Sequence, residues 1–337
     1  MTKTDWACLA FRATGALGAR SLMLRLTTGR ELVILAYHRV AARLPAADVY
    51  DPGVVSCSGP EFEREMAFVK AHFDIVSFRD LDSDRASTAR RPLIVTFDDG
   101  YKDNCEVAWP ILRRLGLRAT FFITTGFIGT GEMPWWDEME YLIRRGGGVR
   151  LTTGPWVGED LAVDSDAGAD RASRVLLAAS KEMPDSRRVA LLQSLREQCG
   201  GRPATDKNLM MTWPDIRALA ADGMEIGSHT VTHPVLGNVE DPARLESELS
   251  ESRRRLQSET GTAVDALSYP VGKGRTVTEG LVAAVKAAGY RYACLYEHGV
   301  NPRQGYDPLR LRRIKTEVGE NFPRFRAKIC FPNLVRY

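Results

Sequence analysis

Short apolar runs alternate with amphipathic segments through much of this chain, and the alternation limits the folds that it can adopt. The runs at residues 31–40, 74–78, 92–97 and 118–127 are rich in aliphatic and aromatic side chains, as buried strands are. Between them, segments such as 59–73 carry apolar residues at helical spacing. Strands that alternate with helices are typical of a parallel sheet. We therefore predict an α/β protein with a barrel, or a close relative of a barrel, at its centre.

The alternating pattern is interrupted between residues 130 and 211. A turn and a short helix are followed by a polar segment with four aspartates over 160–170, and then by one long helical stretch over roughly 171–199. The α/β pattern resumes with a helix over 212–223 and a strand after it. We interpret the interruption as a helical insertion beside the barrel, forming a lid or a substrate wall. The barrel and its insertion together are expected to occupy residues 31–337.

The composition is that of a globular protein without a nucleic-acid partner. A chain of 337 residues is long enough for one large α/β domain or two ordinary ones. The net charge of +3 is small, and no block of five or more like charges occurs, which argues against nucleic-acid binding. The six cysteines are scattered without a CxxC pair, which favours a reducing compartment over secretion. The oligomeric state is left open.

Residues 1–30 are predicted to form a separate N-terminal helical segment. Over 6–30, four arginines are interleaved with leucine, phenylalanine and methionine, so this helix either packs on the body of the protein, which we favour, or rests on a membrane surface. The segment lacks the apolar region and cleavage site of a signal peptide, and no stretch reaches the roughly 18 apolar residues that span a bilayer. We expect a cytoplasmic protein, with peripheral contact to the inner membrane left open.

Two adjacent carboxylates, Asp98 and Asp99, directly follow the predicted strand at 92–97. They could cap a following helix, or they could serve a cation. His38 ends another predicted strand. Because active sites of parallel barrels lie at the carboxyl ends of the strands, all three side chains are candidates for one site.

A pair of histidines, His229 and His233, lies four residues apart after a further predicted strand. With one carboxylate they make a His-His-Asp set that leaves positions open for water and substrate. One aspartate would bind a metal ion, and the other would take a proton from water that the metal activates. Neither pattern is specific alone, but their combination favours the metal site over helix capping.

These two stretches carry a family resemblance. "TFDDGYKDN" (96–104) and "GSHTVTHP" (227–234) resemble the first two motifs of the polysaccharide deacetylases, the NodB-homology or carbohydrate esterase family 4 enzymes. The resemblance covers about residues 31–128 and 207–315. It implies a deformed (β/α) barrel, here with a helical insertion, and metal-dependent hydrolysis of an N-acetyl group, usually on an amino sugar.

The resemblance also implies roles for single residues. Asp98 would be the general base, and Asp99, His229 and His233 would hold one divalent metal ion, most often zinc. The family's third motif is a Pro-Tyr-Gly backbone that helps to form the oxyanion hole. Here "LSYPVGKG" (267–274) takes its place.

In this stretch Tyr269, Pro270 and Val271 are the candidate oxyanion-hole or substrate-binding residues, and the Val271 N–H is the candidate donor. The arginine that often precedes the third motif and orients the base is absent. Arg313 is a candidate to supply its charge from another strand, and it is counted with the candidate oxyanion-hole or substrate-binding residues.

The expected general acid is displaced in sequence. Many family members end a late strand in a histidine that protonates the leaving amine, and no such strand follows residue 300. His38 has the right form near the N-terminus, which resembles the circularly permuted branch that deacetylates poly-N-acetylglucosamine in bacterial exopolysaccharide systems. His38 is therefore the predicted acid. The alternatives are that backbone groups satisfy His38 and that His298, in a loop beyond a strand, is the acid.

Two tryptophans, Trp135 and Trp136, are predicted either to stack on sugar rings or to anchor the insertion by packing. Taken together, the sequence predicts a metal-dependent N-deacetylase that acts on an amino sugar in a glycan or a glycan precursor. The alternatives are a metal-dependent deacylase of a small molecule or glycosylated metabolite and, more remotely, a sugar-binding protein without catalysis.

Overall fold

The computed structural model describes residues 31–42, 51–145, 150–201, 209–317 and 319–332. The helical segment predicted over residues 1–30 lies outside these ranges. Within them, no helix combines the length and the apolar character that crossing a membrane requires.

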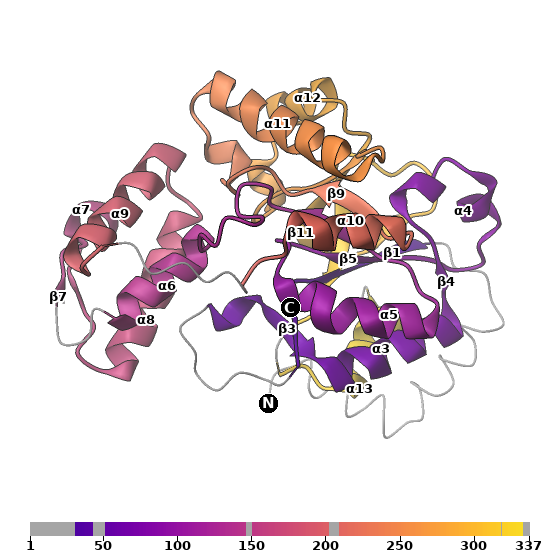
Figure 1. The fold of residues 1–337 in the computed structure, drawn as a ribbon, viewed down its shortest axis with the longest axis horizontal. Coiled ribbons are helices and arrows are strands. Elements are labelled where there is room, and N and C mark those ends of the chain that lie inside the picture. The colour runs from indigo at the N-terminus through magenta and orange to yellow at the C-terminus, as the bar shows by residue number, and fades with distance from the viewer. Residues whose placement is uncertain (1–30, 43–50, 146–149, 202–208, 318, 333–337) are drawn as a thin grey trace.

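Seven parallel strands of the described chain close into a barrel (Figure 1). The ring closes where Val33–Tyr37 of the first strand pair with Leu93–Phe97, so the predicted (β/α) barrel is confirmed. In order around the barrel the strands are β1 (Glu31–Tyr37), β13 (Leu311–Lys315), β11 (Tyr292–His298), β10 (Ala266–Ser268), β9 (Glu225–Ser228), β6 (Thr120–Ile123) and β5 (Pro92–Phe97).

Short strands extend this barrel at two places and form two small sheets elsewhere. Strand β4 (Asp74–Ile75) runs parallel to β5, and β12 (Asn301–Pro302) runs antiparallel to β1. The small sheets are β2 (Arg39–Ala41) with β3 (Val55–Ser58), and β7 (Arg150–Leu151) with β8 (Leu161–Ala162).

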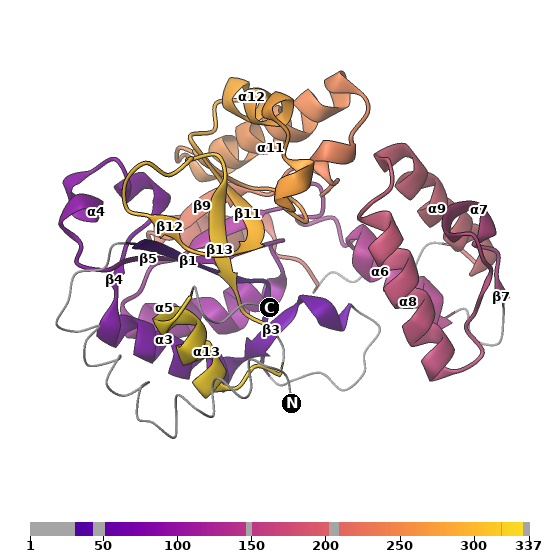
Figure 2. The same ribbon diagram turned by 180° about the vertical axis from the view of Figure 1, so that it is seen from behind.

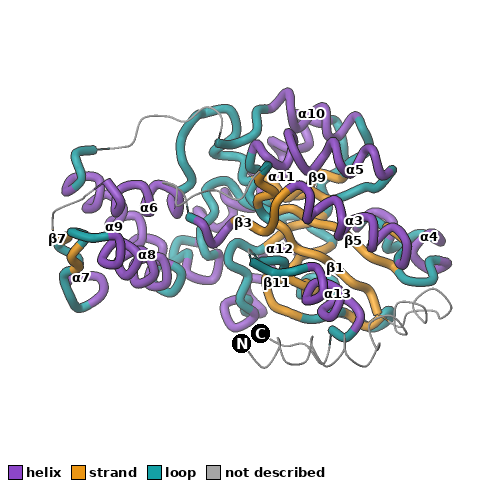
Figure 3. The backbone as a smooth tube through the Cα atoms, turned by 90° about the horizontal axis from the view of Figure 1, so that it is seen from below, coloured by secondary structure: helices purple, strands orange, loops and turns teal. Residues whose placement is uncertain are grey.

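Helices pack on the outside of the barrel, and Figure 3 shows the strands gathered inside them. The C-terminal helix lies beside α3 (Figure 2). The longest helix of the described residues, α11, begins after Asp241, whose side chain accepts a hydrogen bond from the backbone of Ala243. It ends at Gly261 in the left-handed conformation. These outer helices are α3 (Gly59–His72), α4 (Asp84–Thr88), α5 (Trp109–Leu115), α10 (Trp213–Ala221), α11 (Pro242–Thr260), α12 (Glu279–Ala287) and α13 (Phe322–Cys330).

The alternating side chains of the strands build two apolar layers. In β1, Leu32 and Ile34 join a buried cluster inside the barrel, whereas Val33 and Leu35 join a larger cluster with the apolar side chains of the outer helices. A strand buried on both faces needs a continuous apolar sequence. The run at 32–37 is continuously apolar because both faces of this strand are buried in the closed barrel.

A second group of helices stands to one side of the barrel (Figure 1). The segment 130–211, predicted to be an insertion, carries four helices in its described part, with an apolar core of their own that includes Leu142, Leu176 and Leu191. The helices are α6 (Trp135–Arg145), α7 (Gly154–Val157), α8 (Asp166–Ser180) and α9 (Asp185–Gln198).

Some predicted boundaries are wrong. The single helical stretch over 171–199 is two helices, because α8 ends at Ser180 and Pro184 immediately precedes α9. The strand predicted over 118–127 ends at Ile123, where the backbone turns. The strand predicted over 74–78 ends at Ile75.

Candidate active site

The two adjacent aspartates lie in a strained turn at the carboxyl end of β5. The backbone N–H of Asp98 donates to the carbonyl of Tyr37 at 2.9 Å, which continues the pairing of β5 with β1. Asp99 has a φ of 76°, and Gly100 follows with a φ of 93°. A positive φ is costly for a residue with a Cβ, so it is kept only where the surrounding structure enforces it. The turn gives the two neighbouring carboxylates different partners.

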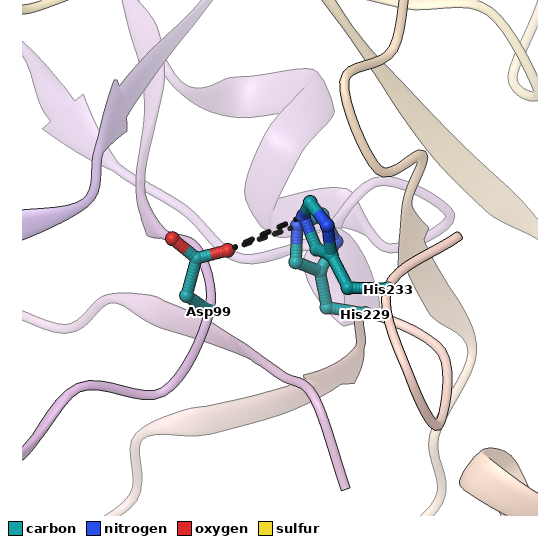
Figure 4. Close-up of side chains that lie close together, drawn as sticks. All are labelled: Asp99, His229 and His233. Carbon is teal, nitrogen blue, oxygen red and sulfur yellow. Dashed lines mark ion pairs between the residues drawn. The ribbon is translucent and has the colours of Figure 1, made fainter. Parts of the chain in front are cut away.

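One of the two carboxylates, that of Asp99, faces two histidines (Figure 4). Its Oδ1 lies 3.4 Å from Nε2 of His229 and 3.5 Å from Nε2 of His233. All three side chains are buried, and their candidate ligand atoms lie within 4.8 Å of one another. His229 directly follows β9, and His233 has a φ of 59° in the loop beyond. One carboxylate and two imidazoles that converge in this way fit a metal ion such as zinc.

The protonation states of two members of this triad, Asp99 and His233, also fit a metal ion. The Nδ1 of His229 donates to the carbonyl of Ser268 at 2.7 Å, which leaves its Nε2 as the ligand atom. Burial, followed by the charge of His229, holds the pKa of His233 well below its usual range, so this ring is neutral. Burial alone would raise the pKa of Asp99, but the hydrogen bond with His229 and the nearby imidazoles lower it. Asp99 is thus an anion and His233 a neutral imidazole. Burial would lower the pKa of His229, but the charges of Asp98 and Asp99 and the hydrogen bond with Asp99 raise it, so this ring would release a proton on binding an ion.

The other carboxylate, that of Asp98, is held by the buried guanidinium of Arg313. Nη1 donates to Oδ1 at 2.8 Å and Nη2 donates to Oδ2 at 2.7 Å. Arg313 also donates to the carbonyl of Leu295 and to the hydroxyl of Thr96, which fix its orientation. Burial would raise the pKa of Asp98, but the charge of Arg313 overcomes this and holds it well below its usual range. Asp98 is therefore anionic at neutral pH.

The placement of Arg313 agrees with the charge that it was expected to supply. It is not among the residues that line the cavity described below, and a contact of its side chain with substrate stays a prediction. It does provide, from β13, a cation beside the candidate base. Its partners lie up to 217 residues away in sequence, which is why the sequence offered it only as a candidate.

The sequence did not predict that Ser268 would contact the candidate base and a candidate metal ligand. Its hydroxyl donates to Asp98 Oδ2 at 3.1 Å and accepts from Arg313 at 2.9 Å, while its carbonyl accepts from His229. One residue at the end of β10 thus contacts both the candidate base and a candidate metal ligand. The sequence offered one signal for this role, since Ser268 lies in the stretch where the base-orienting arginine of the family is absent.

The predicted acid, His38, lines the same cavity as Asp98 and the triad. Its backbone N–H donates to Ser56 Oγ at 2.9 Å, and its carbonyl accepts from Asn104 Nδ2 at 2.7 Å. The ring itself packs edge-on against Tyr296, with 5.1 Å between centroids. These two hydrogen bonds hold the main chain at His38, and the residue lines the cavity. Burial, the largest influence, lowers the pKa of His38.

The competing histidine, His298, lies elsewhere. Its prediction as a loop residue is wrong, since it is the last residue of β11. Its Nε2 lies 3.3 Å from the carbonyl oxygen of Pro332, and it is not among the residues that line the cavity. The geometry therefore favours His38 over His298.

In the loop after β10, two of the three predicted residues reach the cavity. Tyr269 and Val271 line it, whereas Pro270 is buried between them and is not among the lining residues. The Tyr269 hydroxyl donates to the carbonyl of Leu309 at 3.1 Å. Val271 has a φ of 62°, and no acceptor in the described chain takes its N–H.

The paired tryptophans pack around His233 and also line the cavity. Trp135 Nε1 donates to the His233 carbonyl at 3.0 Å, and the Trp136 ring lies 4.3 Å from the His233 ring between centroids. Trp136 Nε1 donates to the Tyr101 hydroxyl, which in turn donates to buried Asp137. The rings thus pack against a candidate ligand and line the cavity, and their stacking on a sugar stays a prediction.

The cavity itself is about 580 Å³ in volume and lies between the barrel and α8. This is within the usual range for a small-molecule or sugar site. A parallel barrel whose strand ends carry a buried Asp-His-His set beside an arginine-paired aspartate is the arrangement of a barrel hydrolase with a candidate metal site.

Comparison with known proteins identifies the family. A family model described as polysaccharide deacetylase matches residues 85–153 and 200–293. The matched ranges, which contain both motifs, form a domain of this family, the NodB-homology group that the motifs resemble.

Two curated proteins show similarity over part of their length. The chain is 22% identical over 238 residues to the Bacillus subtilis (strain 168) protein named "Putative polysaccharide deacetylase YxkH", which covers 70% of this chain and 56% of that protein. It is 51% identical over 59 residues to a gellan lyase of a Bacillus species, covering 18% of this chain and 2% of that protein. The chain thus spans 56% or less of these curated relatives.

Solved structures share the fold. IcaB from Ammonifex degensii superposes with a TM-score of 0.56 at 17% identity, covering 89% of this chain and 97% of that chain. The Streptococcus pyogenes deacetylase PplD in complex with acetate superposes with a TM-score of 0.54 at 17% identity, covering 87% of this chain and 95% of that chain. These likenesses support the fold that the barrel closure establishes.

Proposed function

We propose that this protein is a metal-dependent N-deacetylase that removes the acetyl group from an amino sugar in a glycan or a glycan precursor. Membership of the polysaccharide deacetylase family supports carbohydrate deacetylation. The observation that carries the finer proposal is the pairing of two aspartates with different partners, Asp98 with Arg313 and Asp99 with the two histidines.

The proposed metal site consists of Asp99, His229 and His233, and zinc is the proposed ion because one carboxylate and two imidazoles suit it. A divalent ion supplies Lewis acidity, which polarises a carbonyl and lowers the pKa of water. Asp98 then acts as general base. Its ion pair with Arg313 keeps it ionised and fixes its orientation, so it can accept a proton from the attacking water.

The remaining steps fall to two further groups. Negative charge develops on the carbonyl oxygen as water attacks, and the Val271 N–H is the proposed donor to it. His38 is the proposed general acid, which donates a proton to the nitrogen as the C–N bond breaks. The products are acetate and a free amino group. His38 lines the cavity that holds the triad, which supports this role.

The test is acetate release from N-acetylglucosamine oligomers by purified protein, first stripped of metal and then resupplied with zinc. We expect release only after zinc is restored, and none from Asp98→Asn. As a matched control, Asp164→Asn removes an exposed carboxylate just before α8, outside the cavity, and is expected to retain full activity. Release that persists without metal, or in Asp98→Asn, would refute the proposal. Zinc bound without any release from oligomers would point instead to a small-molecule deacylase.

A further inference from the structure

The cavity that contains the candidate active site has a second, basic wall. Arg174 and Lys181 reach it from α8 and the residue after it, Lys273 from the loop after β10, and Lys315 from the end of β13. Figures 1 and 2 both show α8 within the group of helices beside the barrel. The positions 174, 178 and 181 all line the cavity, as expected of one helical face.

Most acidic groups that line the same cavity already have partners. Asp98 is paired with Arg313, and Asp99 lies between the two candidate histidine ligands. Asp51 Oδ1 accepts a hydrogen bond from the backbone of Gly53 at 2.8 Å, but no cation in the described chain pairs with Asp51.

The fourth acid, Glu182, neutralises part of the basic wall. Its carboxylate pairs with Lys273 at 2.5 Å and also with Arg275. This contact ties the end of α8 to the loop after β10. Asn238 adds a second tie, because its Nδ2 donates to the carbonyls of Lys181 and Met183. The backbone at Lys181 is therefore held against the barrel.

After these pairings, two cations and one acid that line the cavity have no ion-pair partner in the described chain, namely Arg174, Lys181 and Asp51. Lys315 is half-buried, and its Nζ lies 4.3 Å from the centroid of the Tyr296 ring, against which His38 also packs. Burial lowers the pKa of Lys315, so an anion bound beside it would offset the cost of burying its charge.

We propose that the cavity binds an acetylated amino sugar that carries an anionic group, a phosphate or a carboxylate, and that Arg174, Lys181 and Lys315 contact this group. The inference rests on the proposed function, since it specifies the substrate class of the same site. Basic side chains of this kind bind phosphate and carboxylate through charge-assisted hydrogen bonds. A neutral sugar would leave Arg174 and Lys181 without an anionic partner.

A binding measurement tests this inference independently of catalysis. Zinc-loaded full-length Asp98→Asn would be titrated calorimetrically with N-acetylglucosamine, N-acetylglucosamine 1-phosphate and N-acetylmuramic acid. We expect at least one of the two anionic sugars to bind at least tenfold more tightly than the neutral sugar. The phosphate arm and the carboxylate arm show which anion the site takes. Equal binding of all three sugars would overturn the inference, whatever the outcome for acetate release.

Variants in the same background test the residues. Arg174→Gln and Lys181→Met are expected to reduce the affinity for the anionic sugar to that for the neutral one. Lys315→Met should reduce it in part. Lys286→Met, which removes an exposed lysine of α12 outside the cavity, is the control and should leave the preference unchanged. If the preference for the anionic sugar persists in both Arg174→Gln and Lys181→Met, other residues cause it, and the assignment to these two side chains is wrong. Acetate release from neutral oligomers by the wild type would test the proposed function separately.

Discussion

Arg313 and Asp98 form a fully buried ion pair through two parallel hydrogen bonds of 2.8 and 2.7 Å, although 215 residues separate them in sequence. The pair lies inside the barrel, between the apolar interior and the cavity. It gives Asp98 a partner that Asp99 does not share, and so separates the chemistry of two adjacent carboxylates.

Removing one member of the Arg313–Asp98 pair should lower the free energy of unfolding more than removing both charges. Arg313→Met leaves a buried carboxylate without its cation, and we expect the free energy of unfolding to fall by about 3–5 kcal/mol. Adding Asp98→Asn should restore much of this loss, because the second change removes the unpaired charge. Urea denaturation of the two single variants and the double variant measures the coupling. A double variant no more stable than Arg313→Met would contradict the account.

Ser268→Ala should separate catalysis from metal binding. The substitution removes the hydroxyl that contacts Asp98 and Arg313, but it keeps the carbonyl that orients His229. We expect kcat to fall about tenfold, since a hydrogen bond to a charged group contributes about 1.5–3 kcal/mol. The zinc affinity, measured by competition with a chromogenic chelator, should stay the same. A parallel loss of zinc affinity would show that the effect is structural.

His38→Gln and His298→Gln should differ strongly in activity. Loss of a general acid typically lowers the rate about 10²–10⁴-fold, and we expect this for His38. His298 lies outside the cavity and contacts the carbonyl of Pro332, so its substitution should leave kcat nearly unchanged. Steady-state acetate release from both variants measures the difference. Equal losses in the two variants, or a larger loss in His298→Gln, would reverse the assignment.

The stability of the protein should decrease with rising pH because of Glu65. This buried carboxyl accepts a hydrogen bond from Tyr37 at 2.6 Å, and burial raises its pKa to about 8. Unfolded glutamate titrates near pH ~4.3, so between the two values the folded protein binds more protons than the unfolded chain. The free energy of unfolding should therefore fall across this interval, by about 3–5 kcal/mol from Glu65 alone.

Glu65→Gln tests this pH dependence, because glutamine can still accept from Tyr37 but does not titrate. Denaturation at a series of pH values between 5 and 8 should show a shallower slope for Glu65→Gln than for the wild type. Glu63→Gln, which removes a surface carboxylate paired with Arg114, should keep the wild-type slope. Identical slopes for Glu65→Gln and the wild type would show that Glu65 is ionised in the fold.

The barrel and the four central side chains could be predicted from the sequence. Strands buried on both faces require continuous apolar runs, and parallel strands bring their carboxyl ends to one edge. For this reason Asp98, Asp99, His229 and His233 could be expected to meet, although the two motifs lie far apart in the chain. Both requirements are local, because each concerns one strand and the residues that follow it.

The supporting contacts depended on the tertiary structure. Ser268 contacts both Asp98 and His229, and Trp135 holds the carbonyl of His233 from 98 residues away. No local pattern marks such residues, since a serine or tryptophan of the same sequence context can equally face solvent or a different core.

The sequence by itself therefore determined the kind of fold and the chemical groups at its centre, because periodicity and motif spacing are properties of short segments. Only the tertiary structure decided that Arg313 pairs with Asp98, that His38 rather than His298 lies in the cavity, and that α8 brings basic side chains to its wall. These outcomes depend on which segments the closure of the barrel places side by side. That closure is set by the packing of the whole chain.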